Sequence, residues 1–327
     1  MTPAGDVIPV TLVVGWIGGS AWQAALGMAR KLPEAVLLHP FTSERSLRCE
    51  AYQLDEVVSF RSPGCACCAQ RSDLIDRLSL LARRRRRPRH VVVAGLPGAD
   101  AATAVLTLLG DSELARTCEL NGVVACFEHG ELGTGDNSSQ TDLGAAMRAQ
   151  SVQDSLLLAD MVWVRMAAPG TPPPSVVTQA RSLNPCTRVR CTPRPPPATQ
   201  LAALHAWSPP AITRRLRHED ESGAGVTADP LTGSAVLKID RPLIGDRVDQ
   251  WISDLHGSAG LRLLRIEGEL WIDGQPASVI VSGCRTTLTT TAGRPFHRTD
   301  RMRSRLRLCG HELDLRDLSA TLEACAV

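Results

Sequence analysis

Short apolar runs rich in β-branched residues recur along the first half of the chain, and helical patterns separate them. The apolar runs are Val10–Gly15, Ala35–Leu38, His90–Gly95, Val123–Phe127 and Met161–Val164. The helical patterns span residues 21–32, 74–81, 101–109 and 143–159. Uninterrupted apolar runs are typical of strands buried on both faces, and their alternation with helices is typical of a parallel sheet. The pattern therefore predicts an α/β fold whose parallel sheet is covered on both faces.

The pattern changes after prolines concentrate near residues 193–197. Beyond them, strand patterns cover Ala235–Ile239, Leu263–Trp271, Ala277–Val281 and Ser304–Leu308, with amphipathic helices at Arg247–Leu255 and Leu315–Cys325. Proline-rich segments favour domain boundaries. We therefore predict a first domain at residues 1–191, a linker at 192–204 and a smaller α+β domain at 205–327.

The composition is that of a soluble globular protein. The chain has 327 residues, of which 43% are apolar and 21% are charged, and its net charge is +2. This length favours two domains, and the small net charge gives no general attraction to nucleic acid or membranes. Lys31 and Lys238 are the only lysines, so arginine carries the positive charge. We attribute this bias to a GC-rich genome in a bacterium rather than to function.

Eleven cysteines are spread along the chain. In a short secreted protein they would suggest a disulfide framework, but this chain is long and begins without the pattern of a secretory signal. The apolar run from Val7 to Gly15 is too short to span a bilayer. We therefore expect a cytoplasmic protein with free thiols and no membrane contact.

Three of the cysteines, Cys65, Cys67 and Cys68, fall within four positions directly after Gly64. Thiolates this close repel one another unless a soft cation lies between them, and Zn²⁺ is the commonest such cation in proteins. One further donor would complete a tetrahedral site, and Cys49 is a candidate. The alternative interpretation is a buried turn that happens to contain small apolar thiols. We predict zinc ligands at these three positions.

The first strand pattern leads into a glycine-rich turn and a helix, which is the layout of a phosphate-binding loop. Gly15, Gly18 and Gly19 supply the glycines and Ser20 supplies a hydroxyl. A phosphate loop also needs a lysine beside the hydroxyl, and this turn has none. Lys31 lies about three helical turns downstream, too far to reach back. We therefore do not expect phosphoryl transfer at this turn.

Five consecutive arginines begin the segment Arg83–Arg89 at the end of a predicted helix. Such a run suits the negative end of the helix dipole and is ordinarily a solvated surface. It is also able to bind RNA phosphates or an acidic partner. No aromatic residue is interleaved to stack on bases.

The motifs resemble those of one family across nearly the whole chain, the CobW-type P-loop GTPases and zinc metallochaperones. Gly64–Cys68 matches the GCxCC signature of that family, and Leu183–Pro185 resembles its LNP motif. The final stretch, Arg305–Cys325, resembles the close of the CobW C-terminal domain. The resemblance implies a P-loop-GTPase-like parallel-sheet domain followed by a smaller α+β domain, with Zn²⁺ bound at the GCxCC cysteines.

Three parts of the nucleotide site of that family are missing from this chain. The turn Gly15–Ala21 lacks the lysine, Ala94 stands where the family has a strand-end glutamate, and Arg165–Ala168 replaces the guanine-reading NKxD. We therefore expect Gly15, Gly18, Gly19 and Ser20 to be a vestigial phosphate loop. GTP binding and hydrolysis are expected to be lost while the thiols are kept.

These observations predict a CobW-like zinc-binding protein that acts in zinc homeostasis or zinc limitation. One alternative is an active GTP-dependent zinc metallochaperone with an unorthodox loop. Another is a zinc-responsive adaptor that contacts the ribosome, RNA or a client metalloprotein through Arg83–Arg89.

Overall fold

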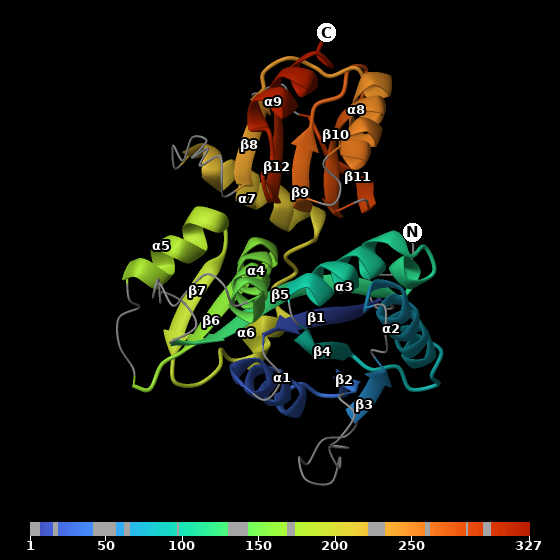
Figure 1. The fold of residues 1–327 in the computed structure, drawn as a ribbon. Helices are drawn as coiled ribbons and strands as arrows, with labels where there is room; N and C mark the ends of the chain where they lie inside the picture. The colour runs from blue at the N-terminus through green and yellow to red at the C-terminus, as the bar shows by residue number, and fades with distance from the viewer. Residues whose placement is uncertain are drawn as a thin grey trace. The chain divides into compact units, whose positions relative to one another are not determined.

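The structure is a computed structural model. It describes residues 7–15, 19–41, 57–61, 66–96, 98–129, 143–168, 174–221, 233–258, 262–285, 287–296 and 302–327. The chain forms two compact units (Figure 1). The first comprises Met1–Arg181 with Thr187–Ala206, and the second comprises Ser182–Cys186 with Trp207–Val327. None of the described helices is both long enough and apolar enough to cross a lipid bilayer.

The first unit is built on a parallel sheet of seven strands in the order β3-β2-β4-β1-β5-β6-β7. The strands are β1 (Ile8–Val14), β2 (Ala35–Phe41), β3 (Val57–Arg61), β4 (His90–Leu96), β5 (Cys118–Glu128), β6 (Met161–Arg165) and β7 (Arg188–Thr192). The predicted parallel sheet is therefore confirmed. Strand β3 was not predicted, because its run of five residues follows a long stretch without apolar periodicity.

Helices connect these strands. They are α1 (Ser20–Lys31), α2 (Ala66–Ala82), α3 (Gly98–Gly110), α4 (Leu143–Leu158), α5 (Pro174–Leu183) and α6 (Ala198–Ala202), with a short 3₁₀ turn at Leu114–Arg116. The buried face of α1 consists largely of alanines, including Ala21, Ala24 and Ala25, with Met28. Small side chains let this helix lie close to the sheet, where it packs against Val13 and neighbouring strand residues.

The proline-rich stretch 192–204, interpreted above as a linker, lies within the first unit. Leu201 of α6 is buried in the core of that unit, and its carbonyl accepts a 2.9 Å hydrogen bond from Nδ2 of Asn121 in β5. The backbone of Asn121 also accepts from the amide of Ala206, at 2.8 Å. The pairing with β5 gives this segment a fixed place, although its sequence has the composition of a linker.

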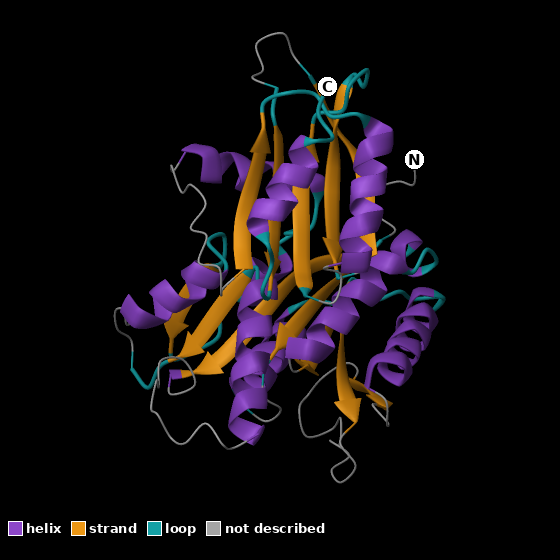
Figure 2. Ribbon diagram, turned by 45° about the horizontal axis from the view of Figure 1, so that its top comes forward, coloured by secondary structure: helices purple, strands orange, loops and turns teal. Residues whose placement is uncertain are grey.

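The second unit contains an antiparallel sheet of five strands in the order β11-β10-β9-β12-β8. These are β8 (Gly233–Ile239), β9 (Leu263–Leu270), β10 (Ala277–Cys284), β11 (Thr287–Pro295) and β12 (Ser304–Gly310). The helices of this unit are α7 (Pro209–Glu221), α8 (Gly245–Ser258) and α9 (Leu315–Glu323), all drawn in purple in Figure 2. The expected α+β organisation is present, and β11 is an additional strand that its threonine-rich sequence did not predict.

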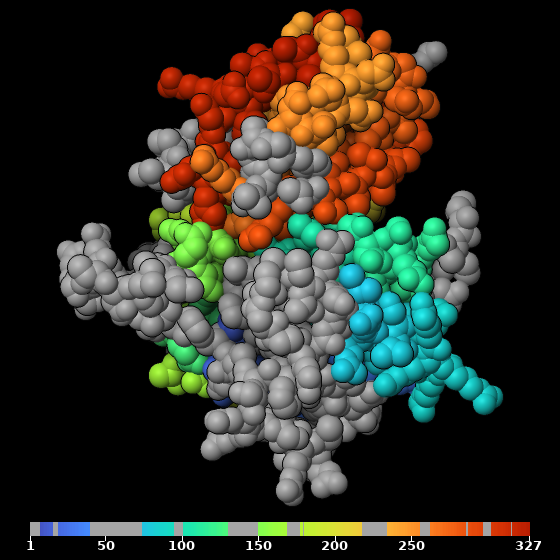
Figure 3. Space-filling model, turned by 45° about the vertical axis from the view of Figure 1, so that its right-hand side comes forward, coloured from blue at the N-terminus to red at the C-terminus, as the bar shows by residue number. Residues whose placement is uncertain are grey.

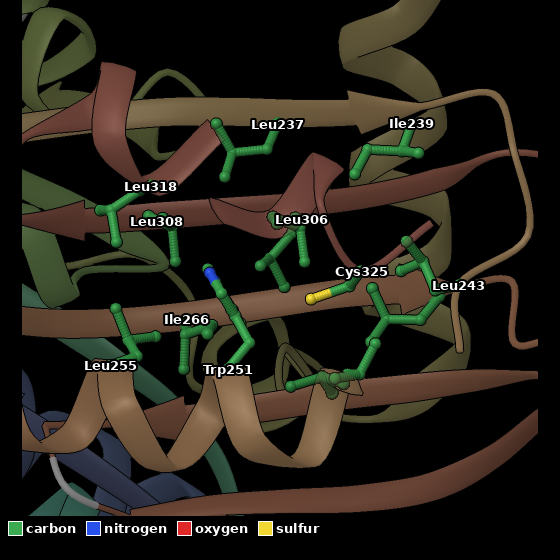
Figure 4. Packing of buried hydrophobic residues seen from close by; sticks show 14 of the residues in the cluster. Leu237, Ile239, Leu243, Trp251, Leu255, Ile266, Leu306, Leu308, Leu318 and Cys325 are labelled. Carbon is green, nitrogen blue, oxygen red and sulfur yellow. The ribbon is translucent and has the colours of Figure 1, made fainter. Parts of the chain in front are cut away.

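One face of this sheet forms an apolar core beneath α8 and α9 (Figure 4). Leu237 and Ile239 of β8, Leu306 and Leu308 of β12 and Ile266 of β9 contribute to it, together with Trp251, Leu255 and Leu318 from the helices and Cys325. The indole nitrogen of Trp251 donates a 3.0 Å hydrogen bond to Oγ1 of Thr321, which joins α8 to α9. Alternating residues of each strand point to this core, as the two-residue period of a strand requires.

Candidate nucleotide and metal site

The first glycine turn lies at the carboxyl end of β1, the central strand of the parallel sheet. Gly15 has a φ of 151°. A Cβ atom there would lie 2.6 Å from the carbonyl oxygen of Cys126 and 2.9 Å from Cβ of Ala21. The position therefore requires glycine on steric and conformational grounds. Gly19 precedes α1 and Ser20 is its first residue, whereas Gly18 lies outside the described residues.

The start of α1 has the backbone geometry of an anion site but lacks the side chain that would bind a terminal phosphate. Ser20 is 3% exposed, and no side chain caps the helix. Lys31 is the last residue of α1. At 1.5 Å per residue it stands about 16 Å along the axis from Ser20. The lysine is thus on the wrong end of the helix for a phosphate at the glycine turn.

An arginine occupies the end of β6, where the guanine-reading motif is expected. Nε of Arg165 donates to Oε2 of Glu128 at the end of β5, at 2.8 Å, and its NH1 donates to Oε1 of Gln23 in α1, at 3.1 Å. The side chains of Arg165 and Glu128 are 37% and 33% exposed. Arg165 therefore links two strand ends to α1, and Ala167 and Ala168 after it offer no carboxylate to a base.

The end of β4 also lacks the expected acid. Ala94 is completely buried and lies in the apolar cluster that contains Val13 and Ala24. A carboxylate at this position would be desolvated in the present packing. The substitution therefore fits the local core rather than a metal or nucleotide function.

Two of the three clustered thiols begin helix α2. Cys67 and Cys68 are in its first turn, and Cys65 and the outer candidate Cys49 lie outside the described residues. The positive end of a helix dipole lowers the pKa of nearby thiols and favours the thiolates that bind metal. The donor set and this backbone position both suit a soft cation. Across the residues whose side chains are described, no three cysteine, histidine, aspartate or glutamate groups gather into a metal site.

The remaining cysteines of the described chain are structural. Cys118, Cys126, Cys191, Cys284, Cys309 and Cys325 are buried free thiols, and Cys186 is half-buried. Burial raises the pKa of Cys118 to about 11, an effect that its hydrogen bond with Thr117 only partly opposes, and burial also raises the pKa of Cys126. The thiols of Cys118 and Cys126 therefore stay protonated near neutral pH and are poor metal ligands.

Asn184 of the LNP motif belongs to a buried charge cluster in the second unit. It is 1% exposed, and its Oδ1 accepts a hydrogen bond from NH2 of Arg307 in β12. NH1 of Arg307 donates to Oε1 of Glu267 in β9, at 3.0 Å. The LNP segment is therefore attached to the C-terminal sheet through this asparagine and arginine.

Glu267 is the centre of that cluster and is fully buried. Besides Arg307, it accepts from NH2 of Arg265 at 2.9 Å and from NH2 of Arg215 in α7 at 2.6 Å. Burial alone would raise the pKa of Glu267, but the three arginines outweigh this effect and hold it well below its ordinary value. The ring of Trp207 covers the Arg265 guanidinium, with 4.4 Å between its carbon and the ring centroid.

This buried cluster was not predicted, although the sequences of β9 and β12 contain a pattern that indicates it. Arg265, Glu267 and Glu269 alternate in β9, and Arg305 and Arg307 alternate in β12. Charged residues at every second position of a strand lie on the same face of the sheet, and the apolar residues between them lie on the other. The pattern therefore indicates that one face of this sheet is charged. Its burial beneath α7 was not apparent from the alternation alone.

The arginine-rich segment Arg83–Arg89 forms the turn after α2. The carboxylate of Glu34 forms ion pairs with Arg86, at 2.9 Å, and with Arg89, at 3.3 Å. Arg83 forms an ion pair with Glu113 at 2.9 Å. The hydrogen bond from Arg86 lowers the pKa of Glu34, against a small opposing effect of burial. In Figure 3 the cyan surface, which includes this turn, carries long side chains that project into solvent. The turn borders a pocket of about 400 Å³.

Family and fold comparisons agree with this architecture. The family "CobW/HypB/UreG, nucleotide-binding domain" matches residues 44–164, and the family "Cobalamin synthesis protein cobW C-terminal domain" matches residues 232–326. Sequence comparison with curated proteins finds no match.

Two solved structures share the fold over almost their whole length. The Zn(II)-bound YjiA GTPase from E. coli is 16% identical, with a TM-score of 0.66, and the alignment covers 98% of this chain and 99% of that one. A Zn(II)-bound triple mutant of YjiA GTPase is 17% identical, with a TM-score of 0.67 and the same coverage. The chain belongs to the CobW family, with a CobW/HypB/UreG nucleotide-binding domain followed by a CobW C-terminal domain.

Proposed function

We propose that this protein is a CobW-type zinc-binding protein that acts in zinc homeostasis or zinc limitation and does not hydrolyse GTP. The observation that carries the proposal is the hydrogen bonding of Arg165 to Glu128 and Gln23. A guanine base is read by a carboxylate that accepts from its N1 and N2 donors. Here the strand end presents a cation, and two of its donors are already hydrogen-bonded to protein acceptors.

Two further features support the loss of nucleotide chemistry. Lys31 lies at the far end of α1, and Ala94 is packed in the core where an acid is expected. The match to the nucleotide-binding family begins at residue 44, beyond the first glycine turn. Phosphoryl transfer depends almost entirely on positioning and on electrostatic stabilisation of the phosphates, and the lysine that supplies part of this is missing from the turn.

The proposal of zinc binding rests on Cys65, Cys67 and Cys68. Three thiolates in one short segment would satisfy most of a tetrahedral zinc shell, and Cys67 and Cys68 lie in the first turn of α2. When bound, Zn²⁺ would be cargo or signal rather than a catalytic group. Because protons compete for the thiolates, its affinity is expected to fall as the pH is lowered.

The metal arm of the test uses the full chain purified under reducing conditions. Zinc is titrated against a chromophoric chelator, and the bound metal is measured by mass spectrometry. We expect one zinc per chain, lost in a Cys65→Ser, Cys67→Ser, Cys68→Ser variant and retained in Cys186→Ser. Zinc binding that survives the triple substitution, or that is absent from the native chain, would refute the zinc assignment.

The nucleotide arm uses fluorescent GTP and GDP analogues with the same protein. We expect no saturable binding and no phosphate release in the presence of Mg²⁺. Turnover that disappears on changing Gly19 and Ser20 would instead identify an active GTP-dependent metallochaperone. The two arms fail independently, since metal binding is measured without nucleotide.

A second candidate is a zinc-responsive adaptor that binds RNA, the ribosome or a client protein through Arg83–Arg89. Arg85 and Arg87 are exposed, and neither has an acidic partner among the described residues. Phosphate contacts by such arginines release counterions and make binding steeply salt-dependent. RNA binding that weakens with salt and is lost in an Arg85→Gln, Arg87→Gln variant would favour this role.

A further inference from the structure

The first six residues of the edge strand β11 lack the usual protection, which is confined to the other end of the strand, where Arg294, Pro295 and a bulge in the pairing with β10 lie. The strand pairs with β10 alone at one end of the antiparallel sheet. Residues 287–292 include no charge and no proline, and Thr290, Thr291 and Ala292 are exposed. Natural edge strands normally carry a lysine, a proline or a bulge that blocks further pairing. The opposite edge, β8, follows this rule with exposed Lys238, whereas this stretch of β11 does not.

The register shows which backbone groups of β11 face outward. Cys284 lies opposite Thr287, so only two positions join β10 to β11, and Arg285 has the positive φ of 51° that tight hairpin turns require. The pair that closes such a turn is hydrogen-bonded, and bonded and non-bonded pairs then alternate. Thr290, opposite Val281, is in a non-bonded pair. Its N–H and C=O therefore point away from β10.

A groove of about 530 Å³ lies beside the second half of β11. It is bounded by the start of α7 and by β10 and β11, all within the second unit. Its apolar lining comes from Pro209, Pro210, Ile280 and Ala292. An apolar groove next to an open strand edge offers anchors for alternate side chains of an added strand.

The charged residues that line this groove are arginines in the part of the chain that the structure describes. They are Arg214, Arg217 and Arg294, and none of the described lining residues is acidic. Arg217 lies 3.8 Å from Glu269, whereas Arg214 is exposed and has no acidic partner among the described residues. A second copy of the same surface would bring like charges together. The groove is therefore complementary to an acidic segment with apolar side chains.

We propose that β11 and this groove bind an extended acidic segment of a partner protein, which adds to the sheet as a further strand. Backbone hydrogen bonds to the edge at Thr290 supply affinity, and the arginines select negative charge. This docking site uses neither the clustered thiols nor the glycine turn. It goes beyond the proposed zinc function and stands or falls separately from it.

The test measures fluorescence anisotropy of a labelled peptide of alternating glutamate and valine with the full chain. A peptide in which lysine replaces glutamate is the matched probe. We expect saturable binding of the glutamate peptide, weakening as salt is raised, and no binding of the lysine peptide. Equal binding of both peptides, or binding of neither, would overturn the proposal.

Substitutions distinguish the contribution of the β11 backbone to peptide binding from that of the groove arginines. Thr290→Pro removes the outward N–H without removing a bond to β10, and Thr290→Val keeps that N–H. We expect Thr290→Pro to weaken binding of the glutamate peptide roughly tenfold and Thr290→Val to leave its affinity unchanged. Arg214→Glu is expected to weaken binding of the glutamate peptide by about fivefold or more. Arg316→Glu, at an exposed position of α9, is expected to have no effect on this binding.

Two controls make the outcome decisive. Near-ultraviolet circular dichroism checks the fold of each variant, and if Thr290→Pro does not fold, the comparison of Arg214→Glu with Arg316→Glu decides. Analytical ultracentrifugation tests whether the chain self-associates. If the native chain forms a dimer and Thr290→Pro dissociates it, the edge of β11 pairs with a second copy of this chain. That result, or displacement of the peptide by single-stranded RNA at equal charge, would refute an acidic peptide as the occupant.

Discussion

Arg165 at the end of β6 donates a 2.8 Å hydrogen bond to Glu128 at the end of β5, and its guanidinium also reaches Gln23 in α1. In the sequence, Arg165 lies 37 positions from Glu128 and 142 positions from Gln23. Their contact places a hydrogen-bonded cation at the carboxyl edge of the sheet, the edge at which ligands bind in open α/β folds.

Removing this arginine should cost stability at the strand ends. Arg165→Ala deletes two hydrogen bonds from a partly buried group, and we expect the free energy of unfolding to fall by about 1 kcal/mol. Arg83→Ala is the control, because both partners of its ion pair with Glu113 are about 70% exposed. It should change stability by less than about 0.5 kcal/mol. Urea titrations of both variants test the prediction, which equal effects would contradict.

Glu267 should be far more sensitive than any surface acid. Glu267→Gln leaves Arg215, Arg265 and Arg307 without their common counter-charge, and two of these arginines are 1% exposed. We expect the second unit to lose about 3–5 kcal/mol of stability. Asp249→Asn, at an exposed position of α8, is the control and should be nearly neutral. Urea unfolding followed by tryptophan fluorescence makes the measurement, and a loss below about 1 kcal/mol would show that the cluster relaxes or hydrates.

His90 should make the first unit sensitive to mild acid. Its Nε2 is 2.8 Å from Oγ1 of Thr11, which in turn accepts from Nδ2 of Asn121 at 2.7 Å. The hydroxyl proton of Thr11 is therefore available to Nε2, and the neutral imidazole is the form that fits. Burial, with a smaller contribution from the charge of His205, lowers the pKa of His90 to about 4.

The sign of the pH effect follows from that depressed pKa. The unfolded chain binds a proton below about pH 6.5, whereas the folded chain does so only near pH 4. Stability is therefore full above pH 6.5 and falls with decreasing pH, by at most about 1.4 kcal/mol per pH unit. Thermal unfolding between pH 7 and 5 should show a shallower slope in His90→Gln than in the native chain. The exposed-site variant His129→Gln should keep the native slope, and an unchanged slope in His90→Gln would exclude this origin.

Two glycines, Gly15 before helix α1 and Gly27 within it, should respond oppositely to alanine. At Gly15 a Cβ would lie 2.6 Å from the Cys126 carbonyl oxygen, and the φ is unfavourable for alanine. We expect Gly15→Ala to destabilise the first unit by about 2 kcal/mol or more. Gly27 lies within α1, where the nearest atom to an added Cβ is 3.7 Å away. Gly27→Ala should stabilise by about 0.4–1 kcal/mol, and melting temperatures that move in the same direction would contradict the assignment.

Much of the parallel-sheet unit was predictable because its strands are locally encoded. β1, β4 and β6 are continuous apolar runs, and burial on both faces leaves no other stable use for them. β3 and β11 were missed for a related reason. Both have short or threonine-rich sequences, and their pairing with β2 and β10 rather than their own pattern holds them in the sheets.

The sequence by itself determined most strands and helices of the first unit, the clustered thiols and the absence of a phosphate-loop lysine, since each depends on residues within a few positions of one another. Only the tertiary structure decided that Arg165 satisfies Glu128, that Asn184 joins Arg307, and that β11 keeps an open edge. The physical reason is that hydrogen-bond satisfaction and burial are properties of pairs brought together by folding, and no local pattern specifies which distant partner a side chain will meet.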